Sequence, residues 1–324
     1  MTISKPNQIL AAVLAVQIAL VAAVFWPRPA ASGNSGPLWA DFKAADVTSL
    51  TISDAEDHKV TLAKSGEAWV LPEADDYPAD STKVTPLLEK IEKVKTNRLV
   101  TQTEASHPRL KVASDDFNSL LEIKLKDDAT HQLYVGSSTG ASATHIRADD
   151  QSEVYLTGDL TSFDASAQAS AWVDTLYFTI PQTATTSLTL ENANGAFEFT
   201  KDGEKWTMKG LAAGETFNEN NFTSLFSQAS ELRMTEPIGK KEVASFGLDK
   251  PQAVITLKTA DKTYTLSIGA RNEEDSTYVV SSSESPYFVR VSEGVVQSFI
   301  EKKRDDFLQL PPTPESGTDS SQPQ

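Results

Sequence analysis

The chain of 324 residues contains no cysteine. This absence excludes disulfide bonds, thiolate zinc sites, cysteine nucleophiles and lipidation of an N-terminal cysteine. Histidine is scarce too: none of the four residues pairs with another at i, i+4 or lies in an H-E-x-x-H pattern, so no metal site is predicted. We interpret these residues as solvated strand or turn histidines: His58, His107, His131 and His145.

Basic residues are also in deficit, with 29 Lys and Arg against 45 Asp and Glu and a net charge of −16. Binding to nucleic acid requires clustered Lys and Arg that displace counterions, so no nucleic-acid partner is predicted. We interpret the acidity as a source of solubility, with a basic partner protein as the alternative. The apolar fraction of 39% is enough for packed cores, and the length suggests two domains.

Motifs for catalysis and cofactor binding are absent or weak. The chain has no phosphate loop and no dinucleotide fingerprint, so no cofactor is predicted. Gly136–Gly140 matches G-x-S-x-G, but a strand is expected after it rather than the helix of a nucleophile elbow. The only later histidine, His145, follows without an intervening acid. We therefore interpret this segment as a hairpin loop and assign no catalytic residue.

Acidic doublets are frequent, and none has the D-x-D-x-D-G register of a calcium loop. They fall between expected strands, where Asp favours turns. A pair of carboxylates assembled in space for glycoside hydrolysis stays open. The acidic groups are Asp75-Asp76, Asp115-Asp116, Asp127-Asp128, Asp149-Asp150 and Glu273-Glu274-Asp275.

The N-terminus carries an apolar run from Ile9 to Trp26, interrupted only by Gln17. As a helix it would be about 27 Å long, close to the hydrocarbon thickness of a bilayer. We expect residues 1–28 to be an uncleaved anchor that contacts membrane lipid through 9–26, with the body outside the cytoplasm. A cleaved signal peptide is the rival interpretation, but the best local cleavage candidate, Ala30-Ala31-Ser32, is poor. Residues 29–37 are expected to be a linker.

An internal duplication dominates the rest of the chain. Thr48–Ile52 reads T-S-L-T-I and Thr186–Leu190 reads T-S-L-T-L, 138 positions later. Asp80, a helix N-cap candidate, corresponds to Asn218 at the same offset. Two apolar series also match in spacing: Val84, Leu87, Leu88, Ile91 and Val94 in the first copy, and Phe222, Leu225, Phe226, Ala229 and Leu232 in the second.

Each copy is expected to form a lobe, over 38–164 and 183–308, with several strands and one amphipathic helix. The helices are predicted over 81–95 and 219–232, and a third helix over 293–308 ends the second lobe. Trp69 and Trp206 recur at the same place and are interpreted as core positions. The apolar segment 165–182, with Trp172, Tyr177 and Phe178, is expected to pack between the lobes, and 309–324 to be disordered. The expected strands are 47–53, 60–64, 69–71, 99–103, 121–126, 131–135, 145–147, 154–156, 187–190, 197–200, 205–208, 253–258, 264–268, 277–281 and 287–291.

These patterns resemble the bacterial family known as domain of unknown function 4340. The resemblance is carried by Val47–Ile52, Trp69–Leu71, the Phe246–Pro251 segment F-G-L-D-K-P and the L-S-I-G of 266–269, followed by Y-F-V-R-V at 287–291. In the first lobe R-L-K-V at 109–112 stands in place of F-G-L-D. The resemblance implies one N-terminal membrane segment and, by association, a role beside ABC-type export permeases and gliding-motility-like auxiliary subunits.

We therefore expect an α+β fold with a transmembrane helix followed by two duplicated lobes, each an antiparallel sheet with one main packing helix. The expected function is that of a non-enzymatic accessory protein, anchored in the bacterial inner membrane, that binds a permease or auxiliary subunit of an ABC-type transporter. One alternative is an extracytoplasmic ligand-binding module that uses the cleft between the lobes. The other is a hydrolase with a spatially assembled carboxylate pair.

Overall fold

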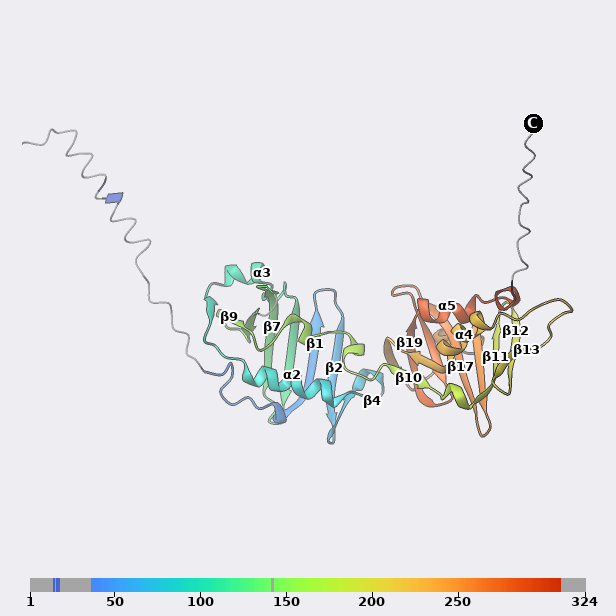
Figure 1. Ribbon diagram of the computed structural model, residues 1–324. Coiled ribbons are helices and arrows are strands. Elements are labelled where there is room, and N and C mark those ends of the chain that lie inside the picture. The colour runs from blue at the N-terminus through green and yellow to red at the C-terminus, as the bar shows by residue number, and fades with distance from the viewer. Residues whose placement is uncertain (1–13, 15, 18–35, 141–142, 310–324) are drawn as a thin grey trace, which may run out of the picture. The chain divides into compact units, whose positions relative to one another are not determined.

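Antiparallel sheets make up most of the fold (Figure 1). The computed structural model describes residues 14, 16–17, 36–140 and 143–309. Few helices accompany the sheets, the longest of them α2 (Ser81–Lys93) and α4 (Glu219–Ser230). The expected α+β class is therefore confirmed in that the described residues form antiparallel sheets accompanied by a few helices.

The first sheet has nine strands in the order β4-β3-β2-β1-β6-β7-β8-β9-β5. Neighbouring strands for which a register is defined pair antiparallel, β1 with β2 through Leu50 opposite Leu62 for example. The strands are β1 (Val47–Asp54), β2 (Lys59–Ser65), β3 (Ala68–Leu71), β4 (Tyr77–Pro78), β5 (Leu99–Thr101), β6 (Ser119–Leu125), β7 (Thr130–Ser138), β8 (Thr144–Ala148) and β9 (Val154–Thr157).

The second sheet has eight strands in the order β13-β12-β11-β16-β17-β18-β19-β15. A separate pair, β10 (Leu176–Thr179) with β14 (Glu231–Arg233), lies outside both sheets. The strands of the second sheet are β11 (Thr185–Asn192), β12 (Gly195–Asp202), β13 (Lys205–Met208), β15 (Glu236–Gly239), β16 (Ala253–Thr259), β17 (Thr263–Asn272), β18 (Thr277–Ser282) and β19 (Ser285–Ser292).

The two sheets repeat one topology. Apart from β4, the first sheet reads β3-β2-β1-β6-β7-β8-β9-β5, and each of these strands has a counterpart at the same place in β13-β12-β11-β16-β17-β18-β19-β15. In each copy a helix follows the first three shared strands: α2 comes after β3 and the additional β4 in the first copy, and α4 comes directly after β13 in the second. The duplication inferred from the sequence is thus present in the order of the strands.

The first four positions of each predicted apolar series form the buried face of α2 or α4, because residues three and four apart share one face of an α-helix. The fifth position is buried too but lies beyond the helix, Val94 directly after α2 and Leu232 in β14, so both helices end two residues before the predicted bounds of 95 and 232. Asn218 caps α4 by accepting a hydrogen bond from the backbone N–H of Asn221. Asp80 accepts instead from the N–H and hydroxyl of Thr82, at 2.9 and 2.6 Å.

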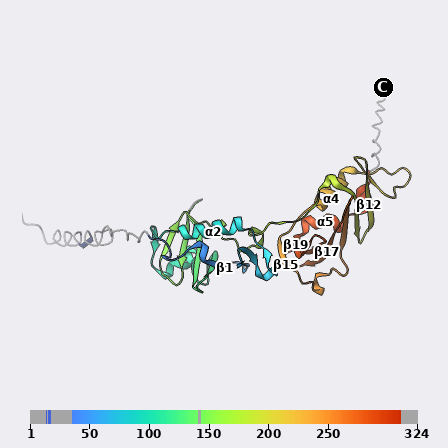
Figure 2. The same ribbon diagram turned by 90° about the horizontal axis from the view of Figure 1, so that it is seen from below.

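The terminal helix is shorter than predicted. The helix α5 ends at Ile300 rather than 308, and a separate 3-10 turn, η8 (Arg304–Phe307), follows it. α5 starts at Glu293 and packs on β11, β16, β18 and β19. Figure 2 shows α5 beside β19. Val296 and Phe299, three residues apart, are its buried side chains.

Contacts divide the chain into two compact units. Of the described residues, unit 1 holds those up to Val47, together with those in Asp54–Glu56 and Pro86–Ala165. Unit 2 holds Thr48–Ser53, Asp57–Thr85 and the residues from Ser166 on. The lobe boundaries 38–164 and 183–308 follow the repeat and stay a prediction, as does the expectation that 165–182 joins the lobes.

Most of the predicted membrane span lies outside the described residues. Within 9–26 only Leu14, Val16 and Gln17 are described, and they are helical. Among the described residues no helix is both long and apolar enough to cross a membrane. The linker 29–37 is described only from Gly36, and the tail only at Gln309.

A glycine in the middle of the sheet supports a close contact in each copy. A Cβ on Gly269 of β17 would lie 2.1 Å from the carbonyl oxygen of Phe246, and a Cβ on Gly136 of β7 would lie 2.2 Å from that of Leu110. The residue after each carbonyl has a left-handed backbone, with φ +63° at Gly247 and +59° at Lys111. The L-S-I-G and F-G-L-D motifs are therefore two halves of one packing contact.

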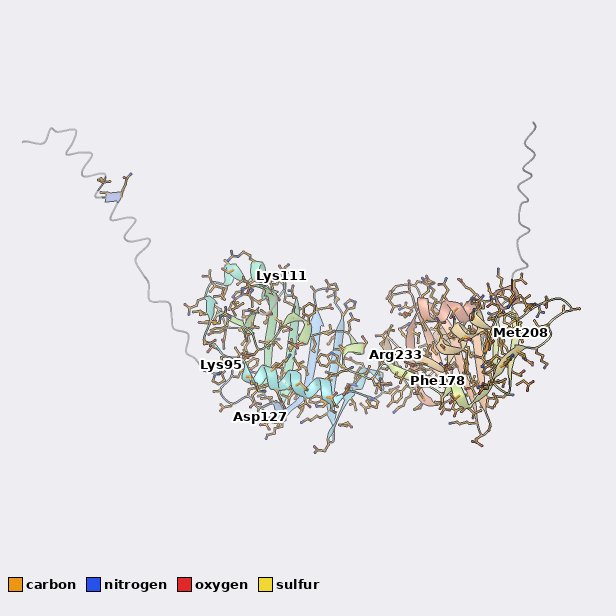
Figure 3. The ribbon with its side chains drawn as sticks, in the orientation of Figure 1. Lys95, Lys111, Asp127, Phe178, Met208 and Arg233 are labelled. Atoms are coloured by element: carbon orange, nitrogen blue, oxygen red, sulfur yellow. The ribbon has the colours of Figure 1, made fainter. Side chains whose placement is uncertain are left out.

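This contact corrects the alignment of the first-copy motif. The sequence pairs Arg109–Val112 with Phe246–Asp249, yet Leu110 occupies the place of Phe246 and Lys111 that of Gly247. The side chains of Val112 and Leu248 both border the glycine. The departure from F-G-L-D is therefore a shift of one residue in which Lys111 (Figure 3) takes the conformation that glycine adopts in the second copy.

Gly269→Ala is expected to destabilise the protein by about 2–3 kcal/mol, because the new methyl group overlaps a backbone oxygen that cannot move without shifting the loop. Gly136→Ala should have a similar effect. Urea unfolding followed by circular dichroism measures both. The control is Gly294→Ala in α5, where a Cβ meets nothing within 4 Å and should leave stability unchanged or raise it by up to about 1 kcal/mol. Equal effects at 269 and 294 would contradict the overlap.

Lys111→Gly is expected to raise stability by about 0.5–1 kcal/mol, because glycine adopts the left-handed backbone without the cost that a side chain brings. The matched control is Lys111→Ala. It removes the same exposed ion pair with Asp116, whose N–O distance is 2.7 Å, but keeps a Cβ. A gain in the alanine variant equal to that in the glycine variant would show that backbone conformation is not the cause.

Candidate functional site

The G-x-S-x-G segment is a β-hairpin. Ser138 is the last residue of β7, and its hydroxyl lies 3.3 Å from that of Thr144 on β8. The Nδ1 atom of His145 lies 2.7 Å from the carbonyl oxygen of Ser137 and 3.1 Å from its hydroxyl. The histidine thus contacts Ser137 rather than the motif serine, and β8 follows where an elbow would require a helix.

Two histidines correct the expectation that all four are solvated. His107 and His145 are buried. His107 bonds through Nε2 with the carbonyl oxygen of Ser152 at 3.0 Å, and His145 bonds with Ser137 as described above. Burial is tolerated because each ring has a backbone partner, which alternation along a strand does not reveal. His131 lies against Trp39, with ring centroids 4.5 Å apart.

The acidic doublets occupy turns. Asp75, Asp76, Asp128 and Asp149 have positive φ angles, a conformation that Asp adopts more easily than most residues. No Asp or Glu within 36–140 or 143–309 is buried. Glu236 is half-buried, and burial raises the pKa of its carboxyl, while the Arg290 guanidinium, 3.2 Å away, opposes the shift. These carboxyl groups stabilise turns or pair with cations.

One turn has the composition of a metal site. Asp54, Glu56 and His58, at the β1–β2 turn, can each offer one ligand atom, and these atoms lie within 4.8 Å of one another. Mixed oxygen and imidazole donors suit several divalent ions. The turn is largely exposed, and both Asp54 and His58 make other interactions.

Trp69, Trp206 and the aromatic residues of 165–182 pack within the fold. Trp69 is 4% exposed, and the Trp206 ring lies 4.7 Å from that of Phe222. Trp172 is buried and donates from Nε1 to the carbonyl oxygen of Ser166, and Tyr177 donates to that of Tyr287. Burial raises the pKa of the Tyr177 hydroxyl well above its usual range. Neither Trp172 nor Tyr177 leaves a ring face free to stack on a ligand.

The two copies differ at the edge next to these tryptophans. In the first copy β4 covers β3, with Pro78 opposite Val70 and Ala79 N–H donating to the carbonyl oxygen of Trp69 at 2.9 Å. In the second copy β13 is the end of the sheet, and among the described strands it pairs only with β12. Trp206, unlike Trp69, is not fully buried. One sheet edge is thus covered in the first copy and open in the second.

A second distinctive region lies in unit 1 at the end of α2, where the described body begins. The backbone there is fixed to the helix end: Leu38 N–H donates to Val94 O at 3.0 Å and Thr96 N–H to Gly36 O at 3.1 Å. Beside this junction is a pocket of about 420 Å³. It is lined by Pro37, Glu92, Lys93, Lys95 and Asp159. We call this region the helix-end face, and Figure 3 marks Lys95 on it.

Phe163 extends this face. It is 94% exposed, on the 3-10 turn η4 (Ser162–Asp164). The turn is held by Asp164, which accepts from Thr161 N–H at 2.8 Å and from Lys90 of α2 at 2.6 Å. A large aromatic side chain is therefore presented to solvent from a fixed backbone.

The exposure of Phe163 is unusual within the repeat. Leu160 and Phe163, three apart, follow β9 as Val296 and Phe299, three apart, follow β19. Leu160, Val296 and Phe299 are all buried, and Phe299 is 1% exposed. Only in the first copy does the aromatic residue leave the core.

The described motifs agree with a family comparison. The family described as "Domain of unknown function (DUF4340)" matches residues 69–242 and, overlapping them, 216–309. The chain belongs to this DUF4340 family. The match includes α2, α4 and the F-G-L-D contact, so the DUF4340 signature coincides with the packing elements of the fold. No curated protein and no solved structure matches the chain.

Sequence reasoning missed both the open edge and the helix-end face of this DUF4340 protein. One signal was present: Thr161 and Asp164 have the spacing of a capping box, which predicts a fixed turn around the apolar Phe163. No signal marked Lys93, Lys95 and Asp159 as neighbours, because the helix end and the loop after β9 meet only through the fold.

Asp164→Asn is expected to cost about 1 kcal/mol of stability at pH 7, because the amide pairs less well with Lys90 and Thr161. Burial opposes ionisation of Asp164, but bonds from Lys90 and Thr161 outweigh it and lower the pKa of the carboxyl. A lowered folded-state pKa gives stability above the unfolded pKa of about 4, and this is lost as the pH falls through the folded value.

The difference between wild type and Asp164→Asn in urea unfolding should therefore be present at pH 7 and shrink as the pH falls below the unfolded pKa of about 4. Asp261→Asn, in an exposed turn between β16 and β17, is the control and should match the wild type at pH 7. A difference that stays constant with pH would mean that ionisation of Asp164 does not stabilise η4.

Proposed function

We propose that this DUF4340 protein is a non-enzymatic, single-pass accessory protein, anchored in the inner membrane, whose extracytoplasmic body binds a subunit of an ABC-type transporter. The observation that carries the partner-binding role is the open β13 edge. The apolar run 9–26 supports the anchor, and the resemblance stated above supports the choice of partner.

The β13 edge has the chemistry of a strand-binding site. Lys209 N–H donates to Glu198 O of β12 at 2.9 Å, so the backbone of residue 209 faces β12. Successive residues of a strand alternate in direction, and the N–H and C=O groups of Met208 and Trp206 therefore face away from the sheet. These are the groups to which a further strand would bond.

In the first copy the corresponding edge, that of β3, already binds a further strand, β4. There the carbonyl oxygen of Trp69 bonds with Ala79 N–H, and the two-residue β4 covers the edge. The equivalent segment of the second copy follows another course: Phe217 pairs with Leu308, and Thr216 O accepts from Gln309 N–H at 2.8 Å. The second copy thus keeps the edge and lacks the cover, so a strand of the partner protein can take its place.

A single cysteine tests this proposal, since the chain has none. Lys205→Cys on β13, carrying a photo-cross-linker, is expected to cross-link full-length protein in native membranes to a permease or auxiliary subunit. Ala68→Cys is the matched control, because Ala68 precedes Trp69 on β3 as Lys205 precedes Trp206 on β13, and both side chains are exposed. Mild-detergent pull-down and mass spectrometry identify the cross-linked peptides.

A cross-link from Lys205→Cys to an extended segment of a transporter subunit, in clear excess over Ala68→Cys, would support the proposal. Equal yields from the two positions would show that the open edge does not select the partner. Recovery of the protein without any transporter subunit would remove the accessory role.

A further inference from the structure

The helix-end face defines where the body can sit relative to a bilayer. Trp26, the last residue of the predicted span, lies ten positions before Gly36, which is bonded to Thr96 after α2. Ten residues reach at most about 35 Å when fully extended. If 9–26 spans the membrane, the end of α2 is the part of the described body whose tether is shortest.

Phe163 gives this face an apolar anchor. Its side chain is 94% exposed, and Lys90 and Thr161 hold its turn at Asp164. The turn that carries Phe163 is linked to the pocket through α2, because Lys90, which binds Asp164, lies about one helical turn before the pocket residue Lys93. An aromatic side chain beside lysines is the composition of surfaces that lie in the headgroup region of a bilayer.

The pocket carries charges of both signs. Lys93 and Lys95 can bind a phosphodiester. Asp159 can accept hydrogen bonds from a primary ammonium group, together with Glu92, whose carboxylate also accepts from Ala44 N–H at 2.9 Å and pairs with Lys43. A phosphoethanolamine headgroup bears these two groups on one short chain. The net charge of −16 disfavours a purely anionic lipid surface, which makes a zwitterionic headgroup the better match.

We propose that the helix-end face rests on the membrane, with Phe163 inserted at the boundary of headgroups and acyl chains and a phosphoethanolamine headgroup in the pocket. This inference rests on the anchor of the proposed function. It adds a second contact, to lipid rather than protein, on unit 1.

The full-length chain in nanodiscs tests the insertion. A spin label at Ser162→Cys keeps Phe163 in place, and its collision rate with oxygen is expected to exceed that with a water-soluble nickel chelate. Adding Phe163→Ser should reverse this order, and because Phe163 makes almost no buried contact the fold should be unaffected. The control label at Asp261→Cys, in an exposed turn of unit 2, should favour the nickel chelate.

Native mass spectrometry tests the headgroup. Protein released from nanodiscs with equal amounts of phosphatidylethanolamine and phosphatidylcholine should retain the former in at least fivefold excess, because trimethylammonium cannot donate hydrogen bonds to Glu92 and Asp159. The double variant Lys93→Glu, Lys95→Glu should lose this preference. The matched control Lys250→Glu, Lys258→Glu, in unit 2, should keep it.

The outcomes separate the two proposals. Protein that does not stay with the nanodiscs would refute the anchor and with it this inference. Protein that stays, but whose label at 162 is equally open to the nickel chelate with and without Phe163, would refute the membrane contact alone. A label protected only when transporter subunits are added would overturn it in favour of a protein contact, and equal retention of both lipids would overturn the headgroup assignment.

Discussion

The fold depends on a carbonyl oxygen that lies against a glycine in the middle of a sheet. Phe246 O at Gly269 and Leu110 O at Gly136 approach so closely that no side chain fits between loop and strand. Each glycine lies within an irregular stretch of pairing, between Ile268 and Arg271 in β17 and between Val135 and Ser138 in β7. An irregular register bends the strand and brings the loop onto it, which only glycine permits at this distance.

The two copies share this contact and differ in the elements at the edges of their sheets. The shared strands have the same order, but only the first copy has β4, and only the second has α5 packed on its sheet. Each loss exposes a feature that its counterpart hides: the β13 edge in the second copy and Phe163 in the first. A buried core tolerates little change, since each position touches several others, so new surfaces arise where a covering element is absent.

The strongly periodic parts of the fold were predictable from sequence. An apolar series with the spacing of Val84, Leu87, Leu88 and Ile91 specifies one face of a helix by itself, and alternation of apolar and polar residues predicted most of the strands. Short strands such as β4 and β15 could not be predicted from the sequence. They have two to four residues and contain a proline, which is too short for an alternating pattern, and they pair only because the fold brings a sheet edge next to them. The burial of His145 was missed for a related reason, since its partner Ser137 O comes from the neighbouring strand. The helix-end face escaped too, because Lys95 and Asp159 are distant in sequence.

Electrostatics explains why the proposed membrane tether would not by itself orient the body. At physiological ionic strength charges are screened over about 8 Å, whereas the proposed tether would reach at most about 35 Å and would let an acidic body move freely above the bilayer. Only a face that balances its charges and offers apolar surface gains by coming within the screening length. At the end of α2, Lys90 pairs with Asp164 and Lys43 with Glu92. In the proposed arrangement this pairing removes the repulsion and Phe163 supplies the attraction.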